Sequence, residues 1–231
     1  MPEGPEVKRF ARDLASKVSG ATLESIDVLS GRYTKKPIPG LQEIQDVLPS
    51  RVIGVGAHGK FLYWILESGH FLYSSLGMTG HWGEKLRKHS RVKFNMTNGK
   101  SVLYTDQRNF GTIKFVYGKH EFEKKISSLG PDMLSEDVTH WVFSQRVKKK
   151  TEWSIAKTIM DQKIIAGVGN YVKAEALWRA EISPHREVKT LTDIELNTLN
   201  NAIKQVLRDS YSNGGATIRS YKTFDGSEGQ Y

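Results

Sequence analysis

The chain has 231 residues, and its 34 lysines and arginines against 25 aspartates and glutamates give a formal net charge of +9. This charge favours an anionic partner such as nucleic acid, while the absence of cysteine excludes disulfides, thiolate nucleophiles and cysteine-based zinc sites within this sequence. No apolar run reaches about 18 residues and no signal-peptide core opens the chain, so we expect an intracellular protein that is neither secreted nor membrane-bound.

The first six residues, Met1-Pro2-Glu3-Gly4-Pro5-Glu6, allow two interpretations. Once Met1 is removed, Pro2 carries a free secondary amine, and an α-amino group has a pKa near about 8. Such an amine attacks an aldehyde-like carbon and forms a Schiff base, with Glu3 beside it to move protons and Glu6 on the next helical turn. The alternative is an ordinary helix start, with Pro5 at the first helical position and Glu6 at the positive helix end. The six residues alone favour this structural alternative.

Apolar periodicity predicts a helix over residues 5–18, stopped by Gly20, followed by a series of β-strands. The strands are expected at 22–29, 51–55, 61–66, 70–76, 91–96, 101–105 and 112–117. Asn98-Gly99 is a two-residue hairpin turn, and residues 31–40 are expected to form an exposed loop. Several short strands at roughly ten-residue spacing predict a sandwich or a barrel.

From about residue 121 the spacing becomes helical, with helices expected at 121–129, 138–147 and 154–160. Thr192 and Glu195 form a capping box that opens a further helix, which ends at Asn213-Gly214-Gly215. We therefore predict an α+β protein, in which residues 1–130 form a β-sandwich with an N-terminal helix and residues 131–231 are helical.

A glycine-containing turn, Gly167-Val168-Gly169-Asn170-Tyr171, precedes another predicted helix. Glycines at a helix start let backbone amides approach a phosphate closely, and the helix end adds partial positive charge. Asn170 would donate a side-chain hydrogen bond there. The alternative is a tight turn between helices, which is the better interpretation of this turn taken by itself.

Three motifs in order, MPEGPE at the start, GVGNY between helices and GGATIRSYKTFDGSEGQY at the end, resemble formamidopyrimidine-DNA glycosylases and their endonuclease VIII relatives. The resemblance implies a β-sandwich joined to a helix–two-turn–helix DNA-binding domain. It also implies a base-excision-repair glycosylase with abasic-site lyase activity, which excises 8-oxoguanine and formamidopyrimidines, with oxidised pyrimidines as further candidates. The expected partner is double-stranded DNA with an oxidised base or an abasic site, bound by a monomer inside the cell.

The resemblance also assigns roles to individual residues. Pro2 would be the nucleophile on the deoxyribose C1′, Glu3 the proton shuttle, and Glu6 a member of the same pocket. Lys60, in the segment GKFL, would contact the phosphate beside the lesion, and Asn170 would be a second phosphate ligand. Strand cleavage would follow by β- and δ-elimination without a cofactor. The alternative for Lys60 is an exposed lysine at a strand start.

Two further segments, LGMTG at 76–80 and DQRNFG at 106–111, resemble the loops that fill the space left by an extruded base. An apolar wedge such as Met78 or Phe110 replaces lost stacking, and Arg108 would bond the orphaned partner base. The family pattern Pro-Arg-Arg-Phe is Gln-Arg-Asn-Phe here, one positive charge fewer. The alternative is that Met78 and Phe110 are core residues.

The segment 215–231 resembles a recognition loop that closes over an oxidised purine, and a flexible linker is its alternative. In the family a β-hairpin finger follows, often with four zinc-binding cysteines. We therefore expect no cofactor or metal within this chain, zinc only with a further finger segment, and weaker DNA binding without it. The competing function is a catalytically inactive DNA- or RNA-binding protein that uses the helical half.

Overall fold

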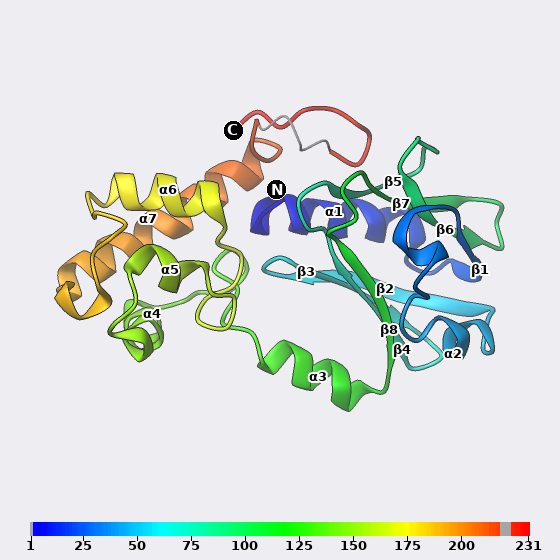
Figure 1. Ribbon diagram of the computed structural model, residues 1–231, viewed down its shortest axis with the longest axis horizontal. Helices are drawn as coiled ribbons and strands as arrows, with labels where there is room; N and C mark the ends of the chain where they lie inside the picture. Colours follow the sequence, from blue (N-terminus) through cyan, green and yellow to red (C-terminus); the bar gives the residue numbers. More distant parts are fainter. Residues whose placement is uncertain (1, 218–222) are drawn as a thin grey trace.

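A computed structural model describes residues 2–217 and 223–231 of the chain. The N-terminal part contains these elements in order: α1 Gly4–Val18, β1 Thr22–Val28, η1 Gly31–Thr34, α2 Leu41–Gln45, β2 Ser50–His58, β3 Phe61–Leu66, β4 His70–Ser75, β5 Gly80–Gly83, β6 Ser90–Met96, β7 Ser101–Asp106, β8 Thr112–Tyr117 and α3 Lys119–Ser127. The C-terminal part contains α4 His140–Val147, η2 Lys148–Lys150, α5 Ile155–Met160, α6 Asn170–Arg179, η3 Val188–Thr190 and α7 Asp193–Ser212. Figure 1 shows the strands on one side, helices α4–α7 on the other, and α3 beneath, linking them.

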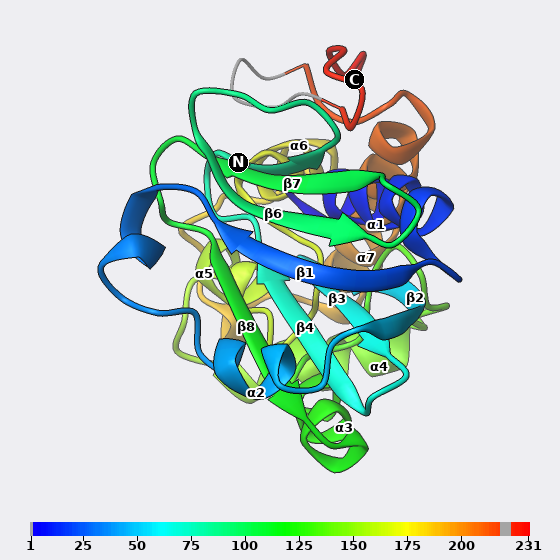
Figure 2. The ribbon, with the colours of Figure 1, turned by 90° about the vertical axis from the view of Figure 1, so that its right-hand side faces the viewer.

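The strands form one antiparallel sheet in the order β5-β7-β6-β1-β2-β3-β4-β8, which folds over at β2. The start of β2 pairs with β1, and the rest of it pairs with β3 as far as His58 opposite Phe61. Figure 2 shows that β1, β6 and β7 consequently run across β4 and β8. Trp64 of β3 packs between the layers, 5.3 Å from the ring of Trp82 and 5.4 Å from that of Phe94. The predicted β-sandwich is confirmed.

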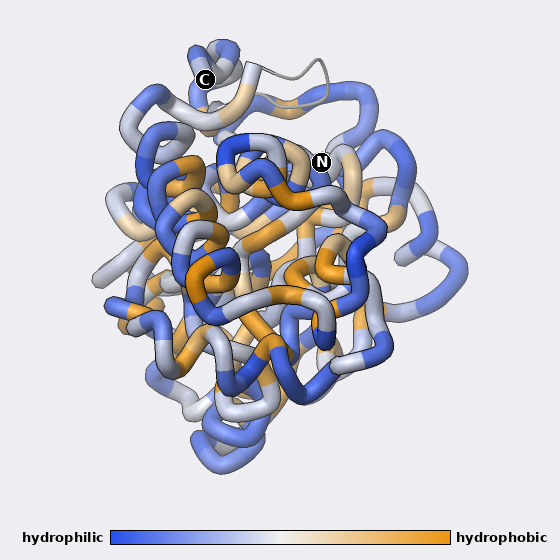
Figure 3. The backbone as a smooth tube through the Cα atoms, turned by 90° about the vertical axis from the view of Figure 1, so that its left-hand side faces the viewer, coloured by the Kyte–Doolittle hydropathy of each residue, from blue (hydrophilic) through white to orange (hydrophobic). Residues whose placement is uncertain are grey.

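Helix α1 lies between the two parts of the molecule (Figure 1). Its apolar stripe is buried and contacts β2, while its start also contacts α7. A second buried cluster, separate from that of the sandwich, fills the interior of the helical part. Figure 3 shows this side of the molecule, with apolar backbone segments inside and hydrophilic ones at the rim. The first residues of the chain are therefore held at the junction of two cores.

The structure departs from the sequence expectations in several local places, of which three bear on the site. Strand β5 was not predicted, because it has only four residues and two of them are glycine. The expected loop 31–40 contains the turn η1, and Tyr33 is buried there, where its hydroxyl accepts a hydrogen bond from the amide of Ile113 at 2.7 Å. Helix α1 begins at Gly4, which makes Pro5 its second residue, because Glu3 is the N-cap residue and its amide donates to the Glu6 carboxylate at 2.8 Å.

Candidate active site and nucleic-acid interface

Glu3 joins the start of α1 to the start of α6. Its side chain is only 2% exposed, and its carboxylate accepts hydrogen bonds from the backbone amides of Tyr171 at 2.9 Å and Val172 at 3.2 Å. These amides have no partner within their own helix, so the carboxylate caps α6 and is stabilised by the positive helix end. A Cβ at Gly169 would lie 2.2 Å from the Glu3 Cδ. Only glycine leaves room for this carboxylate.

Glu6 is fully buried and binds four donors from different parts of the chain. It accepts from the amides of Glu3 and Ala216, each at 2.8 Å, and from the hydroxyls of Tyr171 at 3.0 Å and Ser210 at 3.3 Å. These donors lie directly before α1, on α6, on α7 and on the segment that follows α7. Glu6 therefore lies beside Glu3, as expected, but all of its visible contacts are internal to the protein.

Lys60 forms, with Gly59, the turn between β2 and β3, which packs closely against the helical part. Gly59 has φ +56°, and a Cβ there would lie 2.6 Å from the amide nitrogen of Gly167. The Gly59 amide donates to the buried carboxylate of Asp132 at 3.1 Å. Close packing and this hydrogen bond together fix the backbone that presents Lys60.

The charges of Glu3 and Lys60 influence each other. Burial raises the pKa of Glu3, while the two α6 amides and the charge of Lys60 oppose the rise. Burial lowers the pKa of Lys60, and the charge of Glu3 opposes that fall. The site thus holds a carboxyl group that gains a proton more readily than usual beside an amine that loses one more readily than usual.

Pro2 and Asn170 lie at the two ends of this arrangement. Pro2 is buried and directly precedes Glu3, while Asn170 is exposed at the start of α6, next to the amide that binds Glu3. The amide of Gly4 donates to the carbonyl of Gly167 at 2.9 Å, which fixes the start of α1 against the turn before α6. The structure therefore brings Pro2, Glu3, Lys60 and Asn170 to one junction.

Met78, Arg108 and Phe110 form a surface cluster, which we call the wedge. Met78 is 38% and Phe110 56% exposed, so the alternative of two core residues is wrong. Arg108 connects them, with its Nη1 3.1 Å from the Met78 sulfur and its guanidinium 4.6 Å from the centre of the Phe110 ring. The buried Asp106 holds both loops, because it accepts from the Thr79 hydroxyl at 2.5 Å and the Gly111 amide at 2.8 Å.

Two arginines that the sequence analysis missed, Arg32 and Arg91, hold the backbone of the loop that carries Arg108 and Phe110. Arg32 donates to the carbonyls of Asn109 at 3.1 Å and Gly111 at 2.6 Å. Arg91 is 8% exposed and donates to the carbonyl of Asp106 at 2.7 Å. Of the two, only Arg91 could have been recognised in the sequence, since it is an arginine among the apolar residues of a strand. Buried arginines are rare unless they are paired, so such a residue indicates a partner inside the protein.

The expected recognition loop, 215–231, lies partly outside the described residues, which omit 218–222. Its two ends pair, since the amide of Thr217 donates to the carbonyl of Tyr231 at 2.8 Å and the amide of Tyr231 to that of Gly215 at 3.0 Å. Between them, Phe224 packs against the core of the sandwich. The segment 223–231 therefore connects the helical part with the sandwich across α1.

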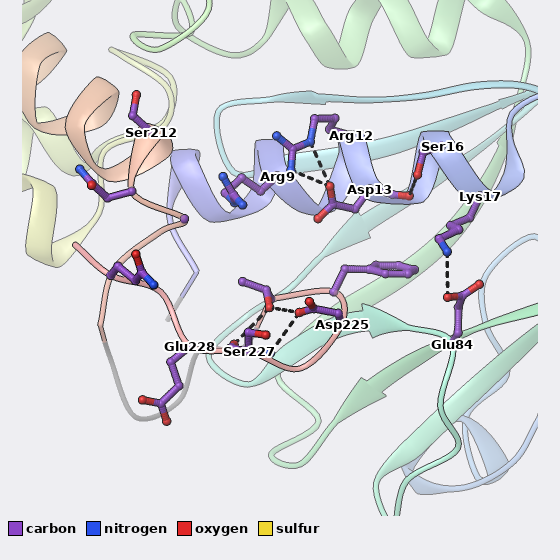
Figure 4. A pocket seen from close by; sticks show the side chains of 15 residues that line it. Arg9, Arg12, Asp13, Ser16, Lys17, Glu84, Ser212, Asp225, Ser227 and Glu228 are labelled. Carbon is purple, nitrogen blue, oxygen red and sulfur yellow. Dashed lines mark hydrogen bonds and ion pairs between the residues drawn. The ribbon is translucent and has the colours of Figure 1, made fainter.

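A polar groove of about 640 Å³ separates this segment from α1 (Figure 4). Arg9, Arg12 and Lys17 of α1 line it together with acidic residues, and Lys17 pairs with Glu84 at 3.1 Å. None of the eight site residues expected from the sequence lines this groove. Within residues 2–217 and 223–231, no group of three or more histidines, cysteines, aspartates or glutamates could hold a metal ion. The same residues contain no helix long and apolar enough to cross a membrane.

The two-part fold agrees with comparisons to known proteins. Residues 1–113 match the family model of the formamidopyrimidine-DNA glycosylase N-terminal domain, and residues 129–222 match that of the H2TH domain of the same enzyme. The chain belongs to the formamidopyrimidine-DNA glycosylase family. This confirms the family and the fold expected from the sequence.

Curated and solved relatives match over almost the whole chain. The formamidopyrimidine-DNA glycosylases of Halalkalibacterium halodurans and Bacillus subtilis are 34% and 33% identical over all of this chain, which spans 86% and 85% of their lengths. The crystal structure of the Thermus thermophilus protein has a TM-score of 0.87 at 32% identity, covering 99% of this chain and 84% of that one. The Lactococcus lactis protein in complex with DNA containing N7-benzyl-Fapy-dG has a TM-score of 0.86 at 26% identity, with coverages of 99% and 85%.

Proposed function

We propose that this chain is a bifunctional DNA glycosylase and abasic-site lyase of base-excision repair. Its substrate would be double-stranded DNA that carries 8-oxoguanine, a formamidopyrimidine or an abasic site. The observation that carries the proposal is the buried Glu3 carboxylate, held against the start of α6 beside Pro2 and within the electrostatic influence of Lys60. The names of the relatives, and the damaged DNA in complex with one of them, support the choice of substrate.

In the proposed reaction the Pro2 nitrogen, freed by removal of Met1, attacks C1′ of the damaged nucleotide. The new C1′–N bond forms as the bond to the base breaks, and the base leaves with a proton. The nitrogen lone pair then expels O4′, which takes a proton from the Glu3 carboxyl as the sugar ring opens. The product is an iminium, which draws electrons from C2′ and acidifies its protons. Glu3 accepts a C2′ proton, the electrons form a double bond, and the 3′ phosphate leaves. A second elimination expels the 5′ phosphate.

Residues from both parts of the molecule would hold the DNA. Lys60 and Asn170 are proposed to bind phosphates on either side of the junction, where a cation and a helix start both favour anions. The wedge would fill the space that the extruded nucleotide leaves, with Met78 and Phe110 stacking and Arg108 bonding the orphaned base. Glu6 would hold Glu3 in place.

We further propose a domain boundary between residues 130 and 131 and a protein that acts as a monomer, in the compartment that contains the DNA. The two separate buried clusters support this boundary. All proposed site residues lie in one chain, so the site needs no second copy.

Borohydride trapping tests the function. Protein from which Met1 has been removed is incubated with an abasic-site duplex and sodium borohydride, which reduces the iminium to a stable covalent bond. We expect a cross-linked product that disappears when Pro2 is acetylated. Tight DNA binding without any cross-link would instead favour the catalytically inactive DNA- or RNA-binding protein.

A further inference from the structure

Tyr171 contacts both buried carboxylates of the site, those of Glu3 and Glu6. Its backbone amide donates to Glu3 at 2.9 Å, and its hydroxyl lies 3.0 Å from the nearer oxygen of Glu6. The same hydroxyl lies 2.9 Å from the hydroxyl of Ser210 on α7. Position 171 therefore joins α1, α6 and α7 at the point where the chain begins.

The phenol of Tyr171 acts as a donor in this network. Burial and the negative charge of Glu6 raise the pKa of Tyr171 well above its usual range, so the hydroxyl keeps its proton. A carboxylate only accepts hydrogen bonds, so the phenol proton is directed to Glu6. The single proton of the Ser210 hydroxyl is shared between the phenol oxygen at 2.9 Å and the Glu6 carboxylate at 3.3 Å. A hydrogen bond to a charged acceptor is stronger than one between neutral groups.

The hydrogen bond from the Tyr171 hydroxyl restricts the orientation of the Glu6 carboxylate, which itself binds two backbone amides. One of its oxygens binds the amide of Glu3, directly after Pro2, and the other binds the amide of Ala216, where the segment 217–231 begins. If the phenol is lost, Glu6 loses its strongest side-chain donor and gains freedom to rotate. The Glu3 amide and the Ala216 amide would then no longer be held in one fixed relation.

We propose that Tyr171 is a positioning residue of the catalytic terminus, which acts through Glu6 to align Pro2 and Glu3 with the segment that follows α7. This inference rests on the proposed function. It concerns the rate of the reaction rather than DNA affinity, because the Tyr171 hydroxyl touches neither Lys60, Asn170 nor the wedge. A small misplacement of a nucleophile is enough to slow a reaction strongly.

The test compares Tyr171→Phe with the wild type and with Tyr117→Phe. Tyr117 is 69% exposed on β8, so its variant loses a hydroxyl far from the site and serves as a matched control. For Tyr171→Phe we expect single-turnover cross-linking to an abasic duplex to slow about 10- to 100-fold, the range for loss of a bond to a charged group. Affinity for a duplex with an uncleavable tetrahydrofuran site should stay within about twofold of the wild type, a match that general loss of structure would not give.

A double-mutant cycle with Glu6→Gln tests whether Tyr171 acts through Glu6. If Tyr171 acts through Glu6, Tyr171→Phe has little further effect in that background. Should Glu6→Gln not fold, as judged by thermal unfolding, Ser210→Ala takes its place in the cycle. An unchanged rate in Tyr171→Phe, equal losses of rate and affinity, or additive effects in the cycle would overturn the inference. Absence of a cross-link in the wild type would instead overturn the proposed function itself.

Discussion

Glu3 and Lys60 show how burial prepares two opposite groups at one site. Burial raises the pKa of Glu3 and lowers that of Lys60, so it favours the neutral form of each group. The charge of the partner opposes each of these shifts. A carboxylate that accepts a proton and an amine that stays charged beside a phosphate are both needed for the proposed reaction. The pair therefore sets the range of pH over which the site is ready.

Replacing Lys60 with Met should move the acid limb of the reaction to higher pH. The charge of Lys60 lowers the pKa of Glu3, so its removal raises that pKa further above the usual 4.5. Because Glu3 must be ionised to accept a proton, a higher pH is then required to reach the same fraction of active protein. Single-turnover cleavage of an abasic duplex at saturating protein, measured across pH, checks this. An acid limb at the wild-type position, as expected for Lys35→Met in an exposed loop, would contradict it.

At the scale of residues, the sequence motifs pointed to Pro2, Glu3, Lys60 and Asn170, and the structure brings these four together. Their roles stay predictions. Tyr171 was quoted only as part of a turn, because its partners Glu6 and Ser210 lie 165 and 39 residues away in the chain. Contacts over such separations leave no local pattern that periodicity or capping rules could detect.

Among the elements, the wedge depends on loops that are held by their backbones. Arg32 donates to the carbonyls of Asn109 and Gly111, and Arg91 donates to that of Asp106. The Asp106 carboxylate accepts a hydrogen bond from the Gly111 amide of the same loop. Asn109 adopts φ +55°, a left-handed conformation that asparagine tolerates better than most residues. The tips are thus exposed, while the loop that carries them is firmly attached.

Arg32→Ala should impair base excision more than cleavage at a preformed abasic site. The variant frees two loop carbonyls, and loss of hydrogen bonds from a charged donor costs about 1.5–3 kcal/mol of stability. A loosened wedge matters most when a stacked base has to be extruded, and an abasic nucleotide has no base to unstack. Single-turnover rates on an 8-oxoguanine duplex and an abasic duplex measure the difference. The control is Arg12→Ala, whose guanidinium pairs with the adjacent Asp13, and equal effects on both substrates would refute the idea.

Most elements were predictable because their signals are local. The Asn98-Gly99 hairpin joins β6 and β7, and the capping box of Thr192 and Glu195 opens α7 as expected. The order of the strands was not predicted, since β1 pairs with β6 about 70 residues later, and this depends on how the sheet folds over at β2. Strand β5 owes its place to β7 rather than to its own sequence.

Across the whole molecule, the relation of the two parts depends on three glycines. Gly4, Gly59 and Gly167 come from α1, the β2–β3 turn and the turn before α6, and a Cβ on Gly4 would lie 3.0 Å from the Gly167 Cα. Gly59 and Gly167 also have positive φ values of 56° and 100°. Backbones can approach this closely only without side chains.

Gly59→Ala should separate the two parts and slow cross-linking, whereas Gly99→Ala should not. Both glycines have positive φ, which costs an alanine about 1–2 kcal/mol, but a Cβ at Gly99 would meet nothing within 4 Å. At Gly59 it would meet the backbone of the helical part, and so displace Lys60 from Glu3. Thermal unfolding temperatures and cross-linking rates of the two variants distinguish the backbone strain that both share from the steric clash that only Gly59→Ala introduces. If both variants lose only the same small amount of stability, the junction is not as tightly packed as described.

The tryptophans divide between the two parts in a way that distinguishes them optically. Trp64 and Trp82 are fully buried between the layers of the sandwich, whereas Trp141 and Trp178 on α4 and α6 are 70% and 77% exposed. Indole emission shifts to the red and becomes open to collisional quenchers when water reaches the ring. Iodide would therefore quench Trp141 and Trp178 first, whereas Trp64 and Trp82 would keep their blue-shifted emission. The fifth tryptophan, the half-buried Trp153 of the helical part, falls between these two groups. The quenched fraction thus follows melting of the helical part, and the protected fraction follows chiefly the sandwich.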